Sequence, residues 1–196
     1  MKTRIIVLGI MMSLVTTCAM ADYYGAVDVG KSTVPQFCDG LVAGNTCNNN
    51  ATDYRLSVGY QVNPIFWPSG ILSPIFGVEV SYVNDGTLHL TAPSAWEHAN
   101  VTEWQVAATS TFPVGSVFSA FGKAGASVWR MNSSANFALS SSFSPSGYSL
   151  LWGLGAQYDI NKTLGVRCFY DSHMIGNSTT LRYHMNTVNL GMVYKF

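Results

Sequence analysis

Apolar and polar residues alternate along eight segments of the chain, and a period of two residues is typical of β-strands. In 53–62, the aromatic and aliphatic side chains share one face, while the polar side chains and a glycine share the other. The eight segments are 23–31, 53–62, 76–83, 103–112, 119–129, 149–160, 163–171 and 187–196. No helical repeat interrupts them, so the pattern predicts an all-β protein.

The connections between these segments alternate in length. Long polar connections of about 15 to 20 residues follow the first, third, fifth and seventh segments. Two short turns, FPVGS and DINKT, and one longer turn over 63–74 close the opposite side. This alternation is typical of outer-membrane barrels. We predict an eight-stranded antiparallel up-and-down transmembrane β-barrel with both termini periplasmic, and a soluble periplasmic β-sandwich is the alternative.

The composition favours a barrel that faces lipid. Charged residues make up 10% of the chain, against about 25% in ordinary soluble domains. Ten basic and ten acidic residues give a formal net charge of zero, and no basic stripe indicates a nucleic-acid partner. After the first 21 residues, no stretch approaches the ~20 apolar residues of a membrane-spanning helix.

The N-terminal residues have the three parts of a secretory signal peptide. Lys2 and Arg4 form the charged start, IIVLGIMMSLVTT forms the apolar core, and Ala19-Met20-Ala21 fits the cleavage rule. A buried N-terminal helix is the alternative. We predict a signal peptide over 1–21 and one outer-membrane barrel domain over 22–196.

Three cysteines follow the signal segment. Cys38 and Cys47 lie in one polar segment of an exported protein, which predicts a disulfide. The alternatives are two free thiols, or a metal pair for which no partner ligands lie nearby. Cys168 lies on an alternating segment and is expected to behave as a small apolar residue.

Candidate catalytic residues occur in the stretch YDSHMIGNS, which contains Ser172 and His173. Some eight-stranded barrels are enzymes that act on lipid A, and they need a nucleophile and a base on the lipid-facing surface. Adjacent strand residues point to opposite faces, so these two are not expected to pair. His89, His98 and His184 are expected in loops, without the spacing of metal ligands. We therefore predict no enzymatic activity, no cofactor and no metal, with a lipid-modifying enzyme as the least favoured alternative.

Several segments resemble the eight-stranded transmembrane domain of OmpA-type proteins. YRLSVGYQVNP with FGVEVSYV is similar to the second and third strands of that family, and FGKAGASVWRMNSS to the fifth. LGVRCFYDS and VNLGMVYKF are similar to the last two strands, and many members carry a cysteine pair in the first loop. Longer members append a peptidoglycan-binding domain, whereas this chain stops at Phe196, so we expect no cell-wall anchor.

The resemblance implies a lumen that holds a network of buried charges. By position, Glu79 and Arg167 match an acidic and a basic partner of that network, whereas Thr109 replaces an expected Lys and Gln157 an expected Glu. Loss of one acid together with one base is expected to keep the lumen neutral. The other inward ionisable residues are Asp28, Arg55, Glu103, Lys123 and Asp171, which we expect to pair across the lumen. Such charges either hold the barrel closed or gate a narrow pore.

The segment 187–196 ends on an outward-facing aromatic residue, Phe196. This resembles the C-terminal signature by which insertion machinery recognises outer-membrane proteins. The long loops are rich in Ser, Thr and Asn and are expected to face the surroundings, where the alternatives are a host ligand, a phage or no ligand, and the composition does not choose among them. We predict a monomer in outer-membrane lipid with a structural or surface-interaction role (adhesion or receptor), and a low-conductance pore is the alternative.

Overall fold

The computed structural model describes residues 21–39, 45–62, 74–92, 95–135, 142–176 and 183–196. The signal segment lies outside these residues except for Ala21, the first residue of β1, and it stays a prediction. Most of the turn over 63–74 also lies outside them. Among the described residues, no helix has the length and apolar character needed to cross a membrane.

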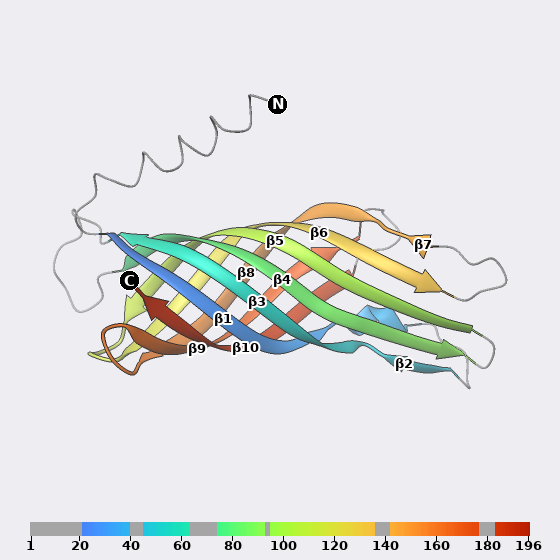
Figure 1. Cartoon of the computed structure of the whole chain (residues 1–196), viewed down its shortest axis with the longest axis horizontal. Coiled ribbons are helices and arrows are strands. Elements are labelled where there is room, and N and C mark those ends of the chain that lie inside the picture. The colour runs from blue at the N-terminus through green and yellow to red at the C-terminus, as the bar shows by residue number, and fades with distance from the viewer. Residues whose placement is uncertain (1–20, 40–44, 63–73, 93–94, 136–141, 177–182) are drawn as a thin grey trace, which may run out of the picture.

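Eight long strands form the body of the molecule (Figure 1). They are β1 (Ala21–Thr33), β3 (Asn50–Val62), β4 (Ile75–Ala92), β5 (Ala95–Pro113), β6 (Phe118–Ala135), β8 (Ser146–Asp159), β9 (Leu164–Ile175) and β10 (Tyr183–Lys195). Each long strand pairs antiparallel with the next along the chain, and β1 pairs with β10. The predicted closed, eight-stranded antiparallel barrel is therefore confirmed.

Three short elements lie beside the barrel strands. They are the 3₁₀ helix η1 (Pro35–Cys38), β2 (Thr46–Asn48), which pairs with β4, and β7 (Ser142–Phe143), which pairs with β6. We call the end where β1 begins and β10 finishes the terminal end, and the opposite end the hairpin end. At the terminal end, the amide of Phe196 donates to the carbonyl of Tyr23 (2.9 Å), so the β1–β10 pairing continues to this residue.

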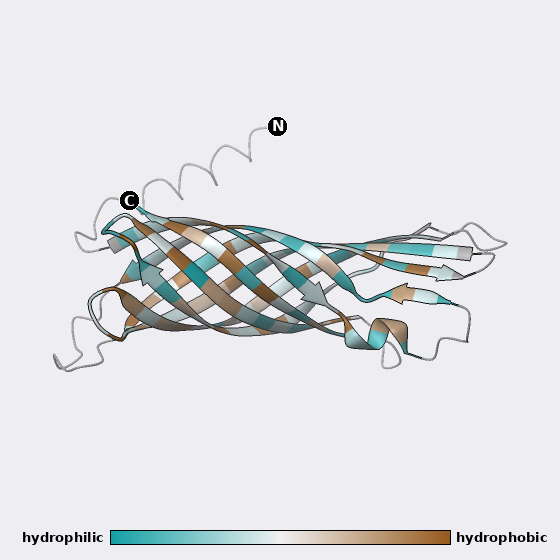
Figure 2. Cartoon of the chain, turned by 90° about the horizontal axis from the view of Figure 1, so that it is seen from below, coloured by the Kyte–Doolittle hydropathy of each residue, from teal (hydrophilic) through white to brown (hydrophobic). Residues whose placement is uncertain are grey.

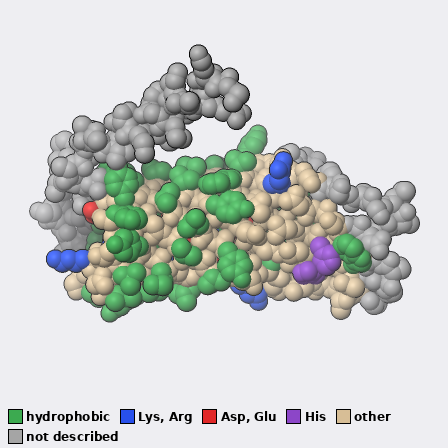
Figure 3. Space-filling view, viewed as in Figure 1, with side chains coloured by type: hydrophobic (Ala, Val, Ile, Leu, Met, Phe, Trp, Pro, Cys, Tyr) green, Lys and Arg blue, Asp and Glu red, His purple; other side chains and the backbone are tan. Residues whose placement is uncertain are grey.

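The alternation in sequence determines which side chains enter the barrel. In β3, Leu56 and Val58 are about 60% exposed on the outside, whereas Arg55 and Ser57, which alternate with them, are buried in the lumen. Figure 3 shows hydrophobic side chains gathered around the part of the barrel nearer the terminal end, and the ribbon of Figure 2 shows hydrophobic and hydrophilic positions alternating along the strands there. Aromatic contacts such as Tyr82–Trp104 (ring centroids 5.2 Å apart) lie on this outer surface. An apolar belt bordered by aromatic residues is the surface that a bilayer requires.

The prediction of long polar loops after 76–83 and 119–129 is wrong. β4 and β5 have 18 and 19 residues, and only 93–94 separate them. β6 also continues to Ala135, beyond the segment expected as strand. Beyond the apolar belt the outer faces of the strands no longer need to be apolar. The alternation of apolar residues therefore stops there, although the backbone pairing of the strands continues. A bulge between Asn84 and Gly86, where Gly86 has a φ of +80°, marks this point on β4.

A disulfide joins Cys38 of η1 to Cys47 of β2, with an S–S distance of 2.02 Å. The bridge lies at the hairpin end and connects two elements that are not among the eight barrel strands. Cys168 is a free, exposed thiol on the outer face of β9.

Because of this position, reduction of Cys38–Cys47 is expected to leave the barrel closed. The unboiled protein should run faster than the boiled protein on an SDS gel with or without reductant. Labelling of the mature, denatured chain with a thiol reagent should modify one cysteine before reduction and three after it. Loss of the fast band on reduction would show that the bridge supports the barrel itself.

Candidate functional site: the lumen

The inward side chains of the strands stack in layers along the barrel. β9 shows the order, because its inward residues from Arg167 to the hairpin end are Arg167, Phe169, Asp171, His173 and Ile175. Along this direction the lumen changes from a small recess through an ion-pair layer and a carboxylate cluster to a hydrophobic plug.

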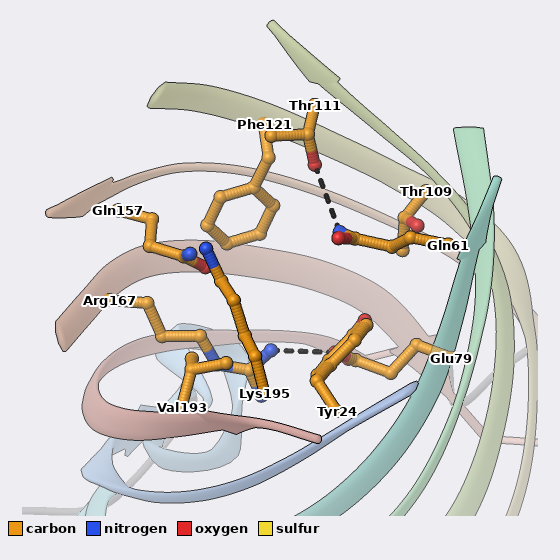
Figure 4. A pocket seen from close by; sticks show the side chains of 10 residues that line it. All are labelled: Tyr24, Gln61, Glu79, Thr109, Thr111, Phe121, Gln157, Arg167, Val193 and Lys195. Carbon is orange, nitrogen blue, oxygen red and sulfur yellow. Dashed lines mark hydrogen bonds and ion pairs between the residues drawn. The ribbon is translucent and has the colours of Figure 1, made fainter. Parts of the chain in front are cut away.

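The recess lies at the terminal end of the lumen (Figure 4). Its lining includes both positions at which the expected network residues are replaced, Thr109 and Gln157. Gln157 donates to Asp159 (2.8 Å), which also pairs with Lys195 (2.7 Å). The water-accessible volume is about 20 Å³, which is room for about one water molecule. The recess is therefore too small to serve as a wide entrance to the lumen.

Arg167 is the centre of the first ion pairs. Its Nε and Nη2 donate to the two carboxylate oxygens of Asp28 (2.7 and 2.6 Å), and its Nη1 donates to Glu79 (2.6 Å). The hydroxyl of Tyr24 also donates to Glu79 (2.9 Å). All four side chains are buried, and a two-pronged guanidinium–carboxylate pair is among the strongest polar contacts in proteins.

A second set of ion pairs surrounds Asp171. Its carboxylate lies 2.6 Å from Arg55 Nη2 and 2.9 Å from Lys123 Nζ. Lys123 Nζ is also 3.8 Å from Glu79, which connects the two sets. The three cationic groups lie 4.6–5.1 Å from the ring centre of Phe169, so cation–π contacts add to the layer.

Glu103 is placed differently from the other six residues proposed for the network. It has no Lys or Arg partner among the described residues. Arg55 donates to Gln105 (2.9 Å), and Gln105 donates to Glu103 (2.6 Å), so the contact with the cation is indirect. Ser127 also donates to this carboxylate. The lumen thus brings Asp28, Arg55, Glu79, Lys123, Arg167 and Asp171 into direct pairs and leaves Glu103 at their edge.

Sequence reasoning missed three ionisable residues of the lumen, which are Asp53, Asp85 and His173. Asp53 has the inward parity of its strand, so its position was visible in the sequence. Asp85 lies in a segment expected as loop, and His173 was considered only as a catalytic base. Among the described residues, six carboxylates and three Lys or Arg groups are buried. Counted as formal charges, the buried acids therefore outnumber the buried bases, and the neutrality of the lumen stays a prediction.

A hydrophobic plug closes the lumen toward the hairpin end. It consists of Val34, Leu88, Val101, Trp129, Ile175 and Met185, each at most 2% exposed. Phe37, Met131 and Tyr183 pack against it. Most of these residues come from connections that carried no strand pattern, so the sequence did not indicate them as neighbours.

Ser172 and His173 lie on opposite sides of β9. The Ser172 hydroxyl donates to Asn186 of β10 (2.9 Å), whereas His173 points into the lumen with its Nε2 3.3 Å from Glu103. The two side chains therefore make no nucleophile–base contact.

The expectation that His89, His98 and His184 lie in loops is wrong, because they belong to β4, β5 and β10. His89 and His98 are opposite each other on an outer surface of the hairpin, with their Nδ1 atoms 2.5 Å apart. Alternation gave no sign of this pair, since both residues lie beyond the apolar belt.

The closed barrel, its apolar belt and its charged interior define an integral β-barrel protein of the bacterial outer membrane. Residues 18–196 match the model of the OmpA-like transmembrane domain, and the chain belongs to this family. A comparison with curated protein sequences gives no match.

Solved structures show the same fold. Ail, the attachment invasion locus protein of Yersinia pestis, in complex with the heparin analogue sucrose octasulfate, is 17% identical with a TM-score of 0.57, covering 90% of this chain and 99% of its own. Neisserial surface protein A has 17% identity, a TM-score of 0.58 and the same coverage. The N-terminal barrel of Pseudomonas aeruginosa OprF has 15% identity and a TM-score of 0.51, and 89% of this chain and 97% of that one are covered.

Proposed function

We propose that the protein acts at the cell surface, as an adhesin or receptor, through the hairpins that continue past its apolar belt. The observation that carries this is the length of β4, β5 and β6 (18, 19 and 18 residues). A barrel strand crosses the hydrocarbon in ~9–11 residues. The remaining residues of these strands form a paired, polar surface outside the membrane, where a partner has access to them.

We infer the orientation of the barrel in the membrane from the unequal lengths of the connections at its two ends. Short turns connect β5 to β6 and β8 to β9 at the terminal end, and outer-membrane barrels have their short turns on the periplasmic side. Both termini are then periplasmic and the hairpins extracellular. Phe196, 79% exposed beside Tyr194, is the residue we assign to recognition by the insertion machinery.

The pore alternative has little support in the lumen. An ion has to pass the Arg167 and Asp171 pairs and then the plug around Trp129, and all of these side chains are buried. Eight strands enclose an interior just wide enough for side chains to fill. A structural, non-conducting barrel is consistent with these contacts.

The alternative of a lipid-modifying enzyme rested on the stretch that contains Ser172 and His173, and these two residues do not form a nucleophile–base pair. Ser172 is only 7% exposed and is bonded to Asn186, and His173 is on the other side of the strand. We therefore propose a non-enzymatic protein.

The relatives support the surface role at the level of the class. Ail is an attachment and invasion protein by name, and its solved complex holds a heparin analogue. NspA is a surface protein by name. Because these identities are below 20%, the particular ligand of this chain is left to experiment.

The proposal is tested by shortening the β4–β5 hairpin. Bacteria that carry the wild-type protein are expected to adhere to surfaces coated with matrix glycoprotein or heparin. A variant in which residues 89–98 are replaced by an Asn-Gly turn should lose this adhesion, because most of the polar extension is gone while the belt and the plug residue Leu88 are kept. The heat-modifiable band of the variant shows that it is inserted.

The matched control is H184N, which changes an exposed residue of β10 outside this hairpin and should leave adhesion unchanged. Equal adhesion of wild-type and shortened protein, at equal surface amounts, would contradict a binding role for the β4–β5 hairpin.

A further inference from the structure

Three buried side chains converge between the ion-pair layer and the plug. Asp85 comes from β4, Glu103 from β5 and His173 from β9, on the opposite side of the lumen. One ligand atom from each lies within 4.8 Å of the others, and His173 Nε2 and Glu103 Oε2 are 3.3 Å apart. Each residue is at most 3% exposed.

These groups have unused capacity to bind a ligand. Asp85 Oδ2 and both ring nitrogens of His173 have no hydrogen-bond partner among the described residues. Asp85 Oδ1 accepts a long hydrogen bond from Ser32 (3.3 Å), which holds the carboxylate in place without using Oδ2. Buried polar groups are normally paired, so each such group requires an explanation.

The charge of this region points to the kind of ligand. In the ion-pair layer, Asp28, Glu79 and Asp171 balance Arg55, Lys123 and Arg167. The three other buried carboxylates, Asp53, Asp85 and Glu103, have no direct Lys or Arg partner among the residues that the structure describes. Buried charges are costly unless they are paired or bind a metal. A divalent cation at this position therefore offsets the charges of Asp85 and Glu103 and gives a partner to Asp85 Oδ2 and to one ring nitrogen of His173.

The donor set selects the class of cation. One imidazole nitrogen and two carboxylate oxygens are typical ligands of zinc and of similar divalent transition ions. Two ligands at about 2.0–2.1 Å from a tetrahedral zinc ion lie ~3.3 Å apart. The His173–Glu103 distance already has this value, and Asp85 has a carboxylate oxygen within 4.8 Å of both ligand atoms.

We propose that Asp85, Glu103 and His173 form a divalent transition-metal site, of zinc type, inside the lumen. The site links β4, β5 and β9 across the barrel directly below the plug. A bound ion bridges these strands and stabilises the barrel when the metal is available. Because the plug and the ion-pair layer enclose the site, the ion is expected to enter while the barrel folds.

The test is zinc binding to the mature barrel refolded from urea into detergent. The protein is refolded with Zn²⁺ or with EDTA, freed of excess metal, and its zinc content and heat-induced unfolding are measured. We expect about one retained zinc ion per barrel and a higher unfolding temperature in the zinc-loaded sample. Cobalt in place of zinc should give visible absorption bands that report on the ligands.

Matched variants separate this site from the exposed histidine pair. D85N, E103Q and H173Q keep side-chain size and should each weaken zinc retention at least about 100-fold. The H89N/H98N variant removes the surface pair and should retain the ion. Each variant is compared only as folded protein with a heat-modifiable band. No retained zinc in the wild-type barrel, or loss of zinc only in H89N/H98N, would overturn the proposal.

Discussion

Replacement of Arg167 by methionine is expected to lower the free energy of unfolding of the barrel by about 3–5 kcal/mol. The guanidinium makes four charge-assisted hydrogen bonds, two to Asp28, one to Glu79 and one to the hydroxyl of Ser57. Methionine fills much of the same volume but leaves both carboxylates buried without their main partner. Urea unfolding in detergent, followed by tryptophan fluorescence and by the heat-modifiable band, measures the difference.

The matched control is K195M. Lys195 also pairs with a carboxylate, Asp159, at 2.7 Å, but both side chains are about a quarter exposed. This pair should contribute at most about 1 kcal/mol. The double variant R167M/D28N should recover part of the loss, because it removes one of the stranded charges. A loss below 1 kcal/mol in R167M would show that water or other groups solvate Asp28 and Glu79.

Replacement of Trp129 by alanine is expected to cost about 3–5 kcal/mol as well, for a different reason. Trp129 is 2% exposed and lies in the hydrophobic plug with Leu88, Val101 and Ile175. Its removal leaves a cavity that the rigid strands around it cannot collapse to fill. The free energy of unfolding is measured as for Arg167. The ion-pair layer below is unchanged, so the variant should still give no channel current in a planar bilayer.

Trp104→Ala is the control for this change. Trp104 is a tryptophan of the same barrel, but it is 58% exposed on the outer face of β5. Lipid or detergent fills the space that it leaves, so the cavity cost is absent and the loss should be clearly smaller. Equal losses of unfolding free energy in the two variants would mean that the plug does not pack as a core. Channel current in Trp129→Ala would show that the plug alone seals the lumen.

The outer surface was predictable because the bilayer imposes a simple rule. Lipid accepts apolar side chains on one face, so every second residue of a spanning segment is apolar, and this is visible at Leu56, Val58 and their counterparts. The same rule located the inward charges, including Arg55 and Arg167. It also placed Ser172 and His173 on opposite sides of one strand.

The lumen was predictable only in part because its contacts cross the barrel. Asp28 and Arg167 are 139 positions apart in sequence, and the parity of a residue does not say which residue faces it. Beyond the belt the rule itself stops, since both faces of a strand there accept polar residues. The continuation of β4 to Ala92, the plug and the position of Asp85 all lie in this region.

The pairing of β1 with β10 also has a consequence for the life of the chain before it folds. At about 5–20 residues per second, roughly 8–33 s pass between the synthesis of Asp28 in β1 and that of its partner Gly191 in β10. The barrel cannot close during this time, because one side of its seam does not yet exist. An exported chain with only 10% charged residues must then travel to the outer membrane with its apolar faces uncovered. We expect it to depend on chaperones that delay folding and prevent aggregation until the whole chain has arrived.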